Sequence, residues 1–344
     1  MPPEPIPDYP PLAGFLADLA ARSRPATTIS ARRLDLSHLI RWYEADRARP
    51  FRLEDLAASD VERWMVAGGV AASTGNRRKA SLRAWAAWAI RQQIIRDDPS
   101  QDIQDARLPQ REAKSVSPAA IDAMLREARK DPDLHLARRN EAMLDLLTFG
   151  GMRVAELTAL ILDDVNLSAR SVFIRNGKGG KSRFIYLDSS SVAVLTRYLT
   201  EVRFAEGVPA TGSRDSQQSI WFHRVGAHER PGITTRAVQL VVQEIAAAAA
   251  QLATADADRA RRQDDKEALR FLAEELKMVT PHTFRHSLAR RMVEDGVDLP
   301  GVAKALGHAH ISTTMIYTVP AEGSLRTAFQ TGGDRVRGRE PNKP

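Results

Sequence analysis

Residues 280–317 read TPHTFRHSLARRMVEDGVDLPGVAKALGHAHISTTMIY, a stretch that places several reactive side chains on short consecutive helices. Thr280 and Pro281 are typical of a helix start, and His282 and Arg285 lie three residues apart on one face of that helix. A helix N-terminus attracts anions. We therefore expect this face to bind a negatively charged group.

The same stretch predicts two further short helices that bring reactive side chains back to this face. Gly307 can adopt a positive φ, so it is expected to end a short helix and present His308. Another helix is predicted to begin at Ser312 and to carry Tyr317. Three helices are thus expected to converge on one pocket.

Two basic residues upstream, Arg153 and Lys178, complete a set of side chains that is suited to phosphoryl transfer. A transferring phosphoryl group spreads negative charge over its oxygens, so it is stabilised by fixed cations and hydrogen-bond donors. A tyrosine hydroxyl can attack phosphorus, while lysine or histidine moves protons. These types predict phosphodiester cleavage without a metal, pointing to DNA strand exchange. The candidate catalytic residues are Arg153, Lys178, His282, Arg285, His308 and Tyr317.

A zinc site is the competing interpretation of the histidines, because His282 and His286 have the helical spacing that zinc proteases use. Thr283 occupies the position of their catalytic glutamate, Arg285 would bring a positive charge against the metal, and the chain contains no cysteine. We predict no metal site and no cofactor, and expect His286 to be structural.

Each remaining candidate also has a purely structural alternative. Tyr317 could be an interfacial aromatic, Arg153 could pair with Glu156, and Lys178 could be a charged turn residue. The combination of these residues in this order favours the catalytic interpretation.

The composition is that of a globular chain of 344 residues with a formal net charge of +7. Such an excess favours an anionic partner. Its amino terminus lacks the features of a secretory signal, and no apolar run is long enough to span a membrane. We expect a cytoplasmic protein with no membrane partner.

The fold class predicted by periodicity is mainly α with a small antiparallel β-sheet, in two domains. Two strands, at 172–174 and 184–187, flank a glycine-rich turn at 176–180. Residues 245–276 are predicted to form a mostly solvated helix or helix pair. The expected segments are a disordered leader (1–11), a helical domain (12–100), a linker (101–116), a second domain (117–330) and a disordered tail (331–344).

On these motifs the chain resembles the tyrosine recombinases of the phage integrase and Xer group. The resemblance extends over nearly the whole chain and rests on GMRVAEL (151–157), GKG (177–179), HTFRH (282–286), LGH (306–308) and STTMIY (312–317). Residues 245–276 are longer than this family usually carries, and could contact a partner subunit, an accessory protein or DNA.

The resemblance implies a role for each candidate residue. Tyr317 would attack the scissile phosphate and form a 3′-phosphotyrosyl link. Arg153, Arg285 and His308 would hold the transition-state oxygens. Lys178 would protonate the departing 5′ oxygen, and His282 would assist proton transfer at the tyrosine. With these roles, DNA strands would be exchanged without metal or ATP.

The resemblance also implies how the chain engages DNA. Its first domain would be a core-binding domain, and the two domains would form a C-shaped clamp around duplex DNA. Four protomers would exchange strands through a Holliday junction. Candidate DNA-binding residues are Thr74, Asn76, Arg77, Arg78, Lys79 and Lys181. Ser73–Asn76 are expected to cap a helix whose first turn carries Arg77–Lys79.

Two rival functions are compatible with these residues. One is a type IB-like topoisomerase that cleaves one strand and relaxes supercoils. The other is a catalytically silent regulator that binds DNA through the same fold.

Overall fold

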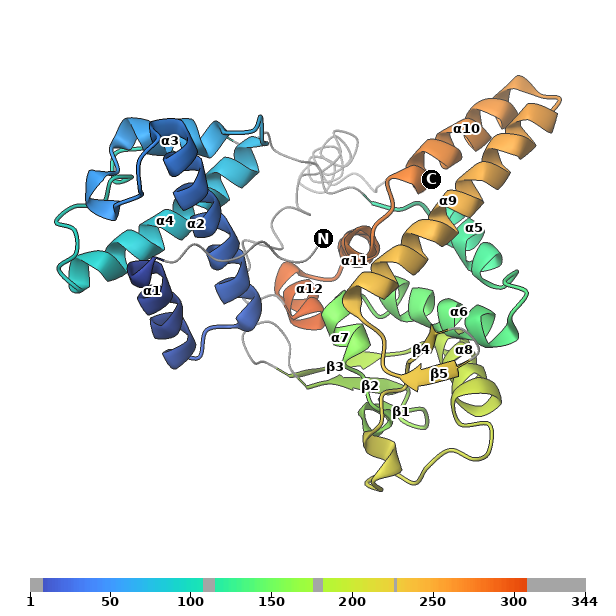
Figure 1. Cartoon of the computed structure of the whole chain (residues 1–344). Helices are drawn as coiled ribbons and strands as arrows, with labels where there is room; N and C mark the ends of the chain where they lie inside the picture. Colours follow the sequence, from blue (N-terminus) through green and yellow to red (C-terminus); the bar gives the residue numbers. More distant parts are fainter. Residues whose placement is uncertain (1–8, 108–114, 176–181, 226–227, 308–344) are drawn as a thin grey trace, which may run out of the picture. The chain divides into compact units, whose positions relative to one another are not determined.

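The computed structural model describes residues 9–107, 115–175, 182–225 and 228–307. The chain divides into two compact units, Met1–Arg111 and Glu112–Pro344, and the division falls inside the predicted linker. The described residues are mostly helical with small antiparallel sheets (Figure 1), which confirms the predicted fold class.

Unit 1 is a helical bundle around an aromatic and aliphatic core. Leu36, Leu39 and Tyr43 on one helix and Leu82 and Trp85 on another are fully buried, so each helix packs one apolar stripe into the core. Its helices are α1 (Pro10–Ala21), α2 (Ala26–Arg47), α3 (Ala58–Val66) and α4 (Ala72–Arg91), with a 3-10 turn at Leu53–Asp55.

The edges of this unit differ from the prediction. The predicted leader ends early, because α1 already begins at Pro10 and the Tyr9 hydroxyl accepts a hydrogen bond from the Leu53 amide at 3.0 Å. The first part of the predicted linker also belongs to unit 1, since Ile103 is part of its core. Helix α4 begins at Ala72, which places Arg77 beyond the first turn.

Unit 2 is built around α6, most of whose residues are buried from Ala137 to Thr148. Ser117 caps α5 by accepting a hydrogen bond from the Ala120 amide, and Pro118 follows at the first helical position. The helices are α5 (Pro118–Ala128), α6 (Leu134–Thr148), α7 (Val154–Thr158), α8 (Ser189–Tyr198), α9 (Thr235–Arg259), α10 (Gln263–Lys277), α11 (Pro281–Glu294) and α12 (Leu299–Leu306). Short helical turns lie at Leu162–Asp164, Leu199–Arg203 and Asp215–Gln217.

The main sheet of unit 2 is an antiparallel meander in the order β1-β2-β3. Val172 of β2 is paired with Val165 on one side and with Ile185 on the other, and the predicted hairpin is confirmed. Its strands are β1 (Val165–Asn166), β2 (Ser171–Ile174) and β3 (Arg183–Tyr186). A separate hairpin consists of β4 (Phe222–Val225) and β5 (His228–Pro231).

Helices α9 and α10 lie side by side as a long hairpin (Figure 1). The prediction of a mostly solvated helix pair is therefore confirmed, since more than half of residues 245–276 are exposed, but α9 also has one buried face. Val238, Val242, Ala246 and Ala250 are buried along one face. Small alanine side chains let two helix backbones approach closely, which explains why an alanine-rich sequence contributes here to a packed core.

Helix α9 is also long and apolar enough to cross a membrane, judged by length and composition alone. The expectation that no segment reaches this length is therefore wrong for α9. Its buried face packs against α5, α6, α7 and α10. Helices in protein cores commonly have the same length and apolar composition.

Candidate active site

The site begins where the backbone leaves α6. Gly151 has φ of +59°, and a Cβ on it would lie 2.6 Å from Cδ2 of Leu288 and 3.0 Å from Cδ2 of Leu306. Both the backbone conformation and the close approach of α11 and α12 therefore require glycine here. The chain then turns into α7, with Arg153 immediately before its first residue.

Arg153 is held by a carboxylate one helical turn ahead of it. Its Nη1 donates to Oε1 of Glu156 at 2.7 Å, and its backbone amide donates to Oε2 at 2.9 Å. Arg183 at the start of β3 binds the same carboxylate through both terminal nitrogens, at 2.9 Å to Oε1 and 2.7 Å to Oε2. Glu156 is therefore shared by two arginines from two elements.

Burial by itself would raise the pKa of the Glu156 carboxyl. Hydrogen bonds from Arg183 and from the Arg153 amide, with the positive charges of both side chains, outweigh burial and lower this pKa to about 2. Glu156 is consequently ionised at physiological pH and is a poor proton acceptor. Its chemistry suits orientation of the arginines rather than reaction.

Arg285, on α11, is buried at 4% exposure. Its Nη1 donates to the Gly151 carbonyl at 2.7 Å, and its Nη2 donates to the Leu306 carbonyl. These bonds fix Arg285 against both the turn before Arg153 and the end of α12. The two arginines predicted to act together are thus joined to one small region.

That region is the carboxyl end of α12, where helical carbonyls lack partners within the helix. Three successive carbonyls there accept bonds from three different arginines: Ala305 from Nε of Arg183 at 3.1 Å, Leu306 from Arg285, and Gly307 from Nη2 of Arg153 at 3.0 Å. Cations are favoured at this end of a helix dipole. Gly307 ends α12 with φ of +64°, as predicted.

We name Arg153, Glu156, Arg183 and Arg285 the arginine–glutamate cluster. Its three guanidinium groups and one carboxylate carry a summed charge of +2, which is suited to holding an anion. Arg153 keeps 21% of its side chain exposed, whereas Arg183 keeps 9%. Arg153 is therefore the more accessible donor of these two.

The first turn of α11 carries the predicted histidines. Pro281 occupies the first helical position, and Thr283 Oγ1 accepts from the Thr280 amide at 3.0 Å, so capping comes from Thr283 rather than from the Thr280 hydroxyl. His282 is exposed, while His286 is half-buried. Burial, and then the charges of His282 and Arg285, lower the pKa of His286.

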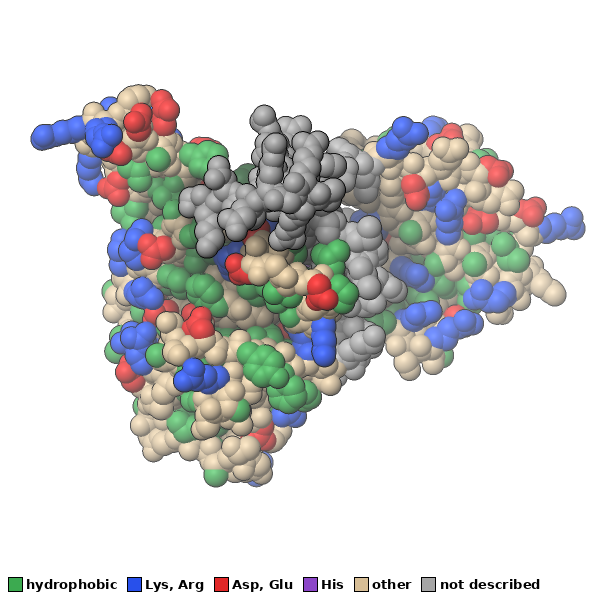
Figure 2. All heavy atoms as spheres, turned by 180° about the vertical axis from the view of Figure 1, so that it is seen from behind, with side chains coloured by type: hydrophobic (Ala, Val, Ile, Leu, Met, Phe, Trp, Pro, Cys, Tyr) green, Lys and Arg blue, Asp and Glu red, His purple; other side chains and the backbone are tan. Residues whose placement is uncertain are grey.

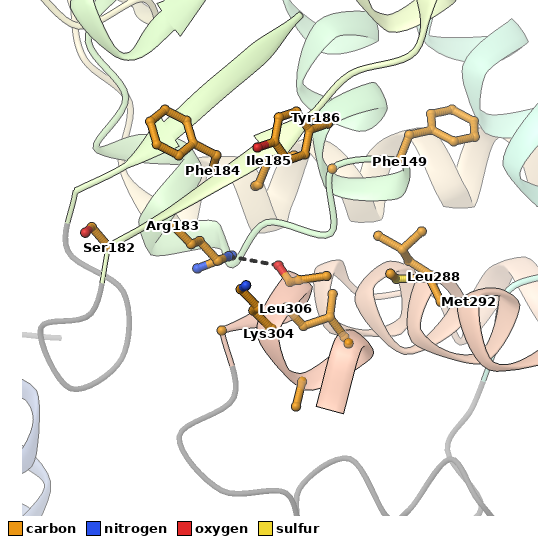
Figure 3. A pocket seen from close by; sticks show the side chains of 15 residues that line it. Phe149, Ser182, Arg183, Phe184, Ile185, Tyr186, Leu288, Met292, Lys304 and Leu306 are labelled. Atoms are coloured by element: carbon orange, nitrogen blue, oxygen red, sulfur yellow. Dashed lines mark hydrogen bonds between the residues drawn. The ribbon is translucent and has the colours of Figure 1, made fainter. Parts of the chain in front are cut away.

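Three predicted catalytic residues, Lys178, His308 and Tyr317, lie outside the described residues, as does the candidate DNA contact Lys181. A pocket of about 810 Å³ adjoins the cluster (Figure 3). Arg183 points across it from β3 toward α12, while Phe149, Tyr186, Leu288 and Met292 form much of its apolar lining.

Sequence reasoning missed Arg183. The signal was strand alternation: Ile185 faces the core at 6% exposure, while Phe184 and Tyr186 are 55% and 77% exposed. Because side chains two apart share a face of a strand, Arg183 had to lie on the buried side with Ile185. A buried arginine needs hydrogen-bond acceptors, and the Glu156 carboxylate provides two of them.

In unit 1, the candidate DNA-binding residues separate by burial. Arg77 keeps 48% of its side chain exposed and pairs with buried Asp35. Thr74 is half-buried, and the Asn76 side chain exchanges two 2.9 Å bonds with the backbone of Ala106.

The prediction that Arg78 and Lys79 contact DNA is corrected by the structure, since both side chains are buried within unit 1. Arg78 donates to the carbonyls of Trp64 and Ala67 at 2.8 and 3.0 Å. Lys79 donates to the Ile103 carbonyl at 2.8 Å. These side chains hold unit 1 together and are buried rather than presented at its surface.

Surface charge alone does not mark a binding face. Figure 2 shows Lys and Arg side chains scattered over the visible surface of each unit, with Asp and Glu among them. The concentration of positive charge inside the arginine–glutamate cluster is the more informative feature.

Comparison with known proteins agrees with this geometry. The sequence model of the Phage integrase family matches residues 114–323. The tyrosine recombinase XerD of Ralstonia nicotianae is 31% identical, with 91% of this chain and 89% of the relative covered. XerD of Yersinia pestis is 29% identical, with coverages of 94% and 97%.

Two solved structures share the fold at low sequence identity. XerH bound to its difH substrate has a TM-score of 0.61 at 20% identity, covering 95% of this chain and 90% of that one. The Tn1549 transposon integrase in complex with a circular intermediate DNA has a TM-score of 0.63 at 18% identity, covering 93% and 98%. Taken with the family match, the chain belongs to the phage integrase family and is a tyrosine-type site-specific recombinase.

Proposed function

We propose that this recombinase cleaves and rejoins double-stranded DNA through a 3′-phosphotyrosyl intermediate and a Holliday junction, without metal or ATP. The observation that supports it best is the arrangement of Arg153 and Arg285 around the end of α12, with a summed cluster charge of +2. Fixed guanidinium donors match the charge that develops on the non-bridging oxygens of a phosphodiester.

In the proposed reaction the Tyr317 oxygen attacks phosphorus and the bond to the 5′ oxygen breaks. Lys178 delivers a proton to that oxygen, and His282 assists removal of the proton from tyrosine. Arg153, Arg285 and His308 hold the non-bridging oxygens. The phosphotyrosyl ester conserves the bond energy, so a 5′ hydroxyl from another strand can reverse the step.

The proposed assembly is a tetramer on two DNA sites, in which each protomer clamps the duplex between its two domains. Arg77 and Thr74 on α4 are the described residues that we propose as DNA contacts in unit 1, with Lys181 in unit 2. Because lysine and arginine contacts release counterions, binding should weaken steeply with salt. We place this activity in the cytoplasm and propose no membrane partner.

The test requires the natural target. DNA captured covalently by the protein in its host is sequenced, and the recovered site is built into a nicked suicide substrate that traps the adduct. The wild-type protein should form a covalent adduct in the presence of a chelator, whereas Tyr317→Phe should bind the DNA without forming one. Tight binding with no adduct from the wild type would favour a silent regulator.

A second assay separates recombination from relaxation. A substrate with paired sites should yield four-way junctions and recombinants. Relaxation of supercoiled DNA with no recombinant product would instead favour a topoisomerase. Inhibition by the chelator would revive the zinc interpretation.

A further inference from the structure

Arg183 has no part in the proposed chemistry, yet its guanidinium donates three hydrogen bonds, two to Glu156 and one to the end of α12. It joins three elements: β3, on which it lies, α7 through Glu156, and the end of α12 through the Ala305 carbonyl. Its side chain keeps only 9% exposure. It is therefore poorly placed to contact DNA directly and well placed to hold its neighbours.

The division of Glu156 between the two arginines has a consequence for Arg153. Arg183 forms a bidentate pair with the carboxylate, so the Arg153 side chain contacts one oxygen only. Arg153 uses its other terminal nitrogen on the Gly307 carbonyl. Without Arg183, both Glu156 oxygens would be available to Arg153, and a bidentate pair would compete with these other bonds.

Arg183 also binds the carboxyl end of α12, the segment whose carbonyls accept hydrogen bonds from Arg153 and Arg285. Its bond to the Ala305 carbonyl lies beside the bonds that those two arginines make to Gly307 and Leu306. In addition, a Cβ on Gly307 would lie 2.9 Å from Nη1 of Arg183, so the guanidinium packs directly against this turn.

We propose that Arg183 is a positioning residue: it occupies Glu156 and braces the end of α12, so that the Arg153 guanidinium keeps donors directed to the scissile phosphate. This inference rests on the proposed function, because it assumes that Arg153 binds the phosphate. It predicts that loss of Arg183 acts through Arg153 and not through DNA affinity.

The experiment uses single-turnover cleavage of the suicide substrate by the full chain. Arg183→Gln should slow adduct formation roughly 10- to 100-fold, the scale expected when a catalytic group is misplaced, with DNA affinity changed less than about 3-fold. Arg129→Gln is the matched control, since Arg129 binds a different buried glutamate, Glu141, at 2.7 Å, and should cleave at the wild-type rate.

A second substrate distinguishes positioning from a general loss of folded protein. Replacing one non-bridging oxygen of the scissile phosphate with a methyl group removes its charge. If Arg183 positions a cation for that charge, Arg183→Gln should lose much less rate on the methylphosphonate than on the phosphodiester, as should Arg153→Ala. Equal loss on both substrates would overturn the proposal, and so would a normal rate on the phosphodiester.

Arg183→Lys guards against a misfolded glutamine variant. Lysine keeps the charge but cannot make the forked contact with Glu156. The lysine variant should fold, and its cleavage rate should lie between those of wild type and Arg183→Gln, again with a smaller loss on the methylphosphonate. A ratio of phosphodiester to methylphosphonate rates equal to that of wild type would count against the proposal. Failure of the wild-type protein to form any adduct would refute the proposed function itself, which is a separate result.

Discussion

Two buried carboxyl groups of unit 2, Glu156 and Asp145, have pKa values that are shifted in opposite directions, although burial raises both. Both are almost inaccessible, at 7% and 5% exposure. At Glu156 the arginine donors outweigh burial and the pKa falls to about 2. At Asp145 burial dominates, the charges of Asp188 and Glu141 add to it, and the pKa rises to about 6.

The difference teaches that burial does not decide the charge of a carboxylate; the donors aimed at it do. Glu156 is kept ionised because two arginines donate to it as a common acceptor. Asp145 lies along the packed helix α6, where its ionised form is a cost. Glu156 therefore organises the candidate site, whereas ionised Asp145 lowers the stability of the core.

The largest expected effect is that of Glu156→Gln on the stability of unit 2. The substitution leaves Arg153 and Arg183 without their shared counter-charge, and should lower the free energy of unfolding by roughly 3–5 kcal/mol. Hydrogen exchange of α6 and α7 peptides across a urea series reports unit 2 separately. Glu201→Gln, which breaks a surface pair with Arg138, should cost less than about 1 kcal/mol.

The pH dependence sharpens the same prediction. The folded pKa of Glu156 lies below its ordinary value of 4.5, so its stabilisation is complete above about pH 4.5 and is lost as the pH falls toward 2. The gap between wild type and Glu156→Gln should close over this range. A constant gap would show that the carboxylate charge is not what stabilises the cluster.

A smaller and opposite effect is expected for Asp145→Asn. Its folded pKa lies above the ordinary value of 3.8, so wild-type stability from this group is present below about pH 4 and is lost as the pH rises through 6. The asparagine variant should be more stable than wild type by about 1–3 kcal/mol at pH 7 and nearly equal at pH 4. A marked loss of stability at pH 7 would contradict the assignment.

The smallest effects extend the comparison to two cations of α4. Lys79→Met removes the shorter of the two hydrogen bonds to the Ile103 carbonyl, which also accepts from Arg83, and should destabilise unit 1 by about 1–3 kcal/mol without altering the salt dependence of DNA binding. Arg77→Gln should lower the slope of log affinity against log salt by about one, and should also cost stability because it leaves the buried Asp35 carboxylate without its arginine partner. A lowered slope for Lys79→Met with an unchanged slope for Arg77→Gln would restore Lys79 as a DNA contact.

Much of the fold was predictable because local signals and packing agree. Leu36, Leu39 and Tyr43 follow a helical period and are buried, and the strands around 172–174 and 184–187 alternate and pair. Ser117 and Pro118 start a helix where capping chemistry places it. In these segments one sequence pattern admits one arrangement.

The failures arose where a side chain's surroundings come from distant sequence. Lys79 follows Arg77 in a basic run, but the Ile103 carbonyl and the helix face decide that it is buried. Arg183 seemed an ordinary residue after a turn because its partners, Glu156 and Ala305, are far away in the chain. Periodicity would have identified its inward face, but not those partners.

The most direct test of the account is the site of covalent attachment. Wild-type protein trapped on a nicked substrate is digested, and the peptide that carries the nucleotide is identified by mass spectrometry. The account predicts a 3′-phosphate ester on Tyr317, formed at least a hundredfold more slowly by Arg153→Ala. A nucleotide attached to any other residue, or a normal rate without Arg153, would contradict it.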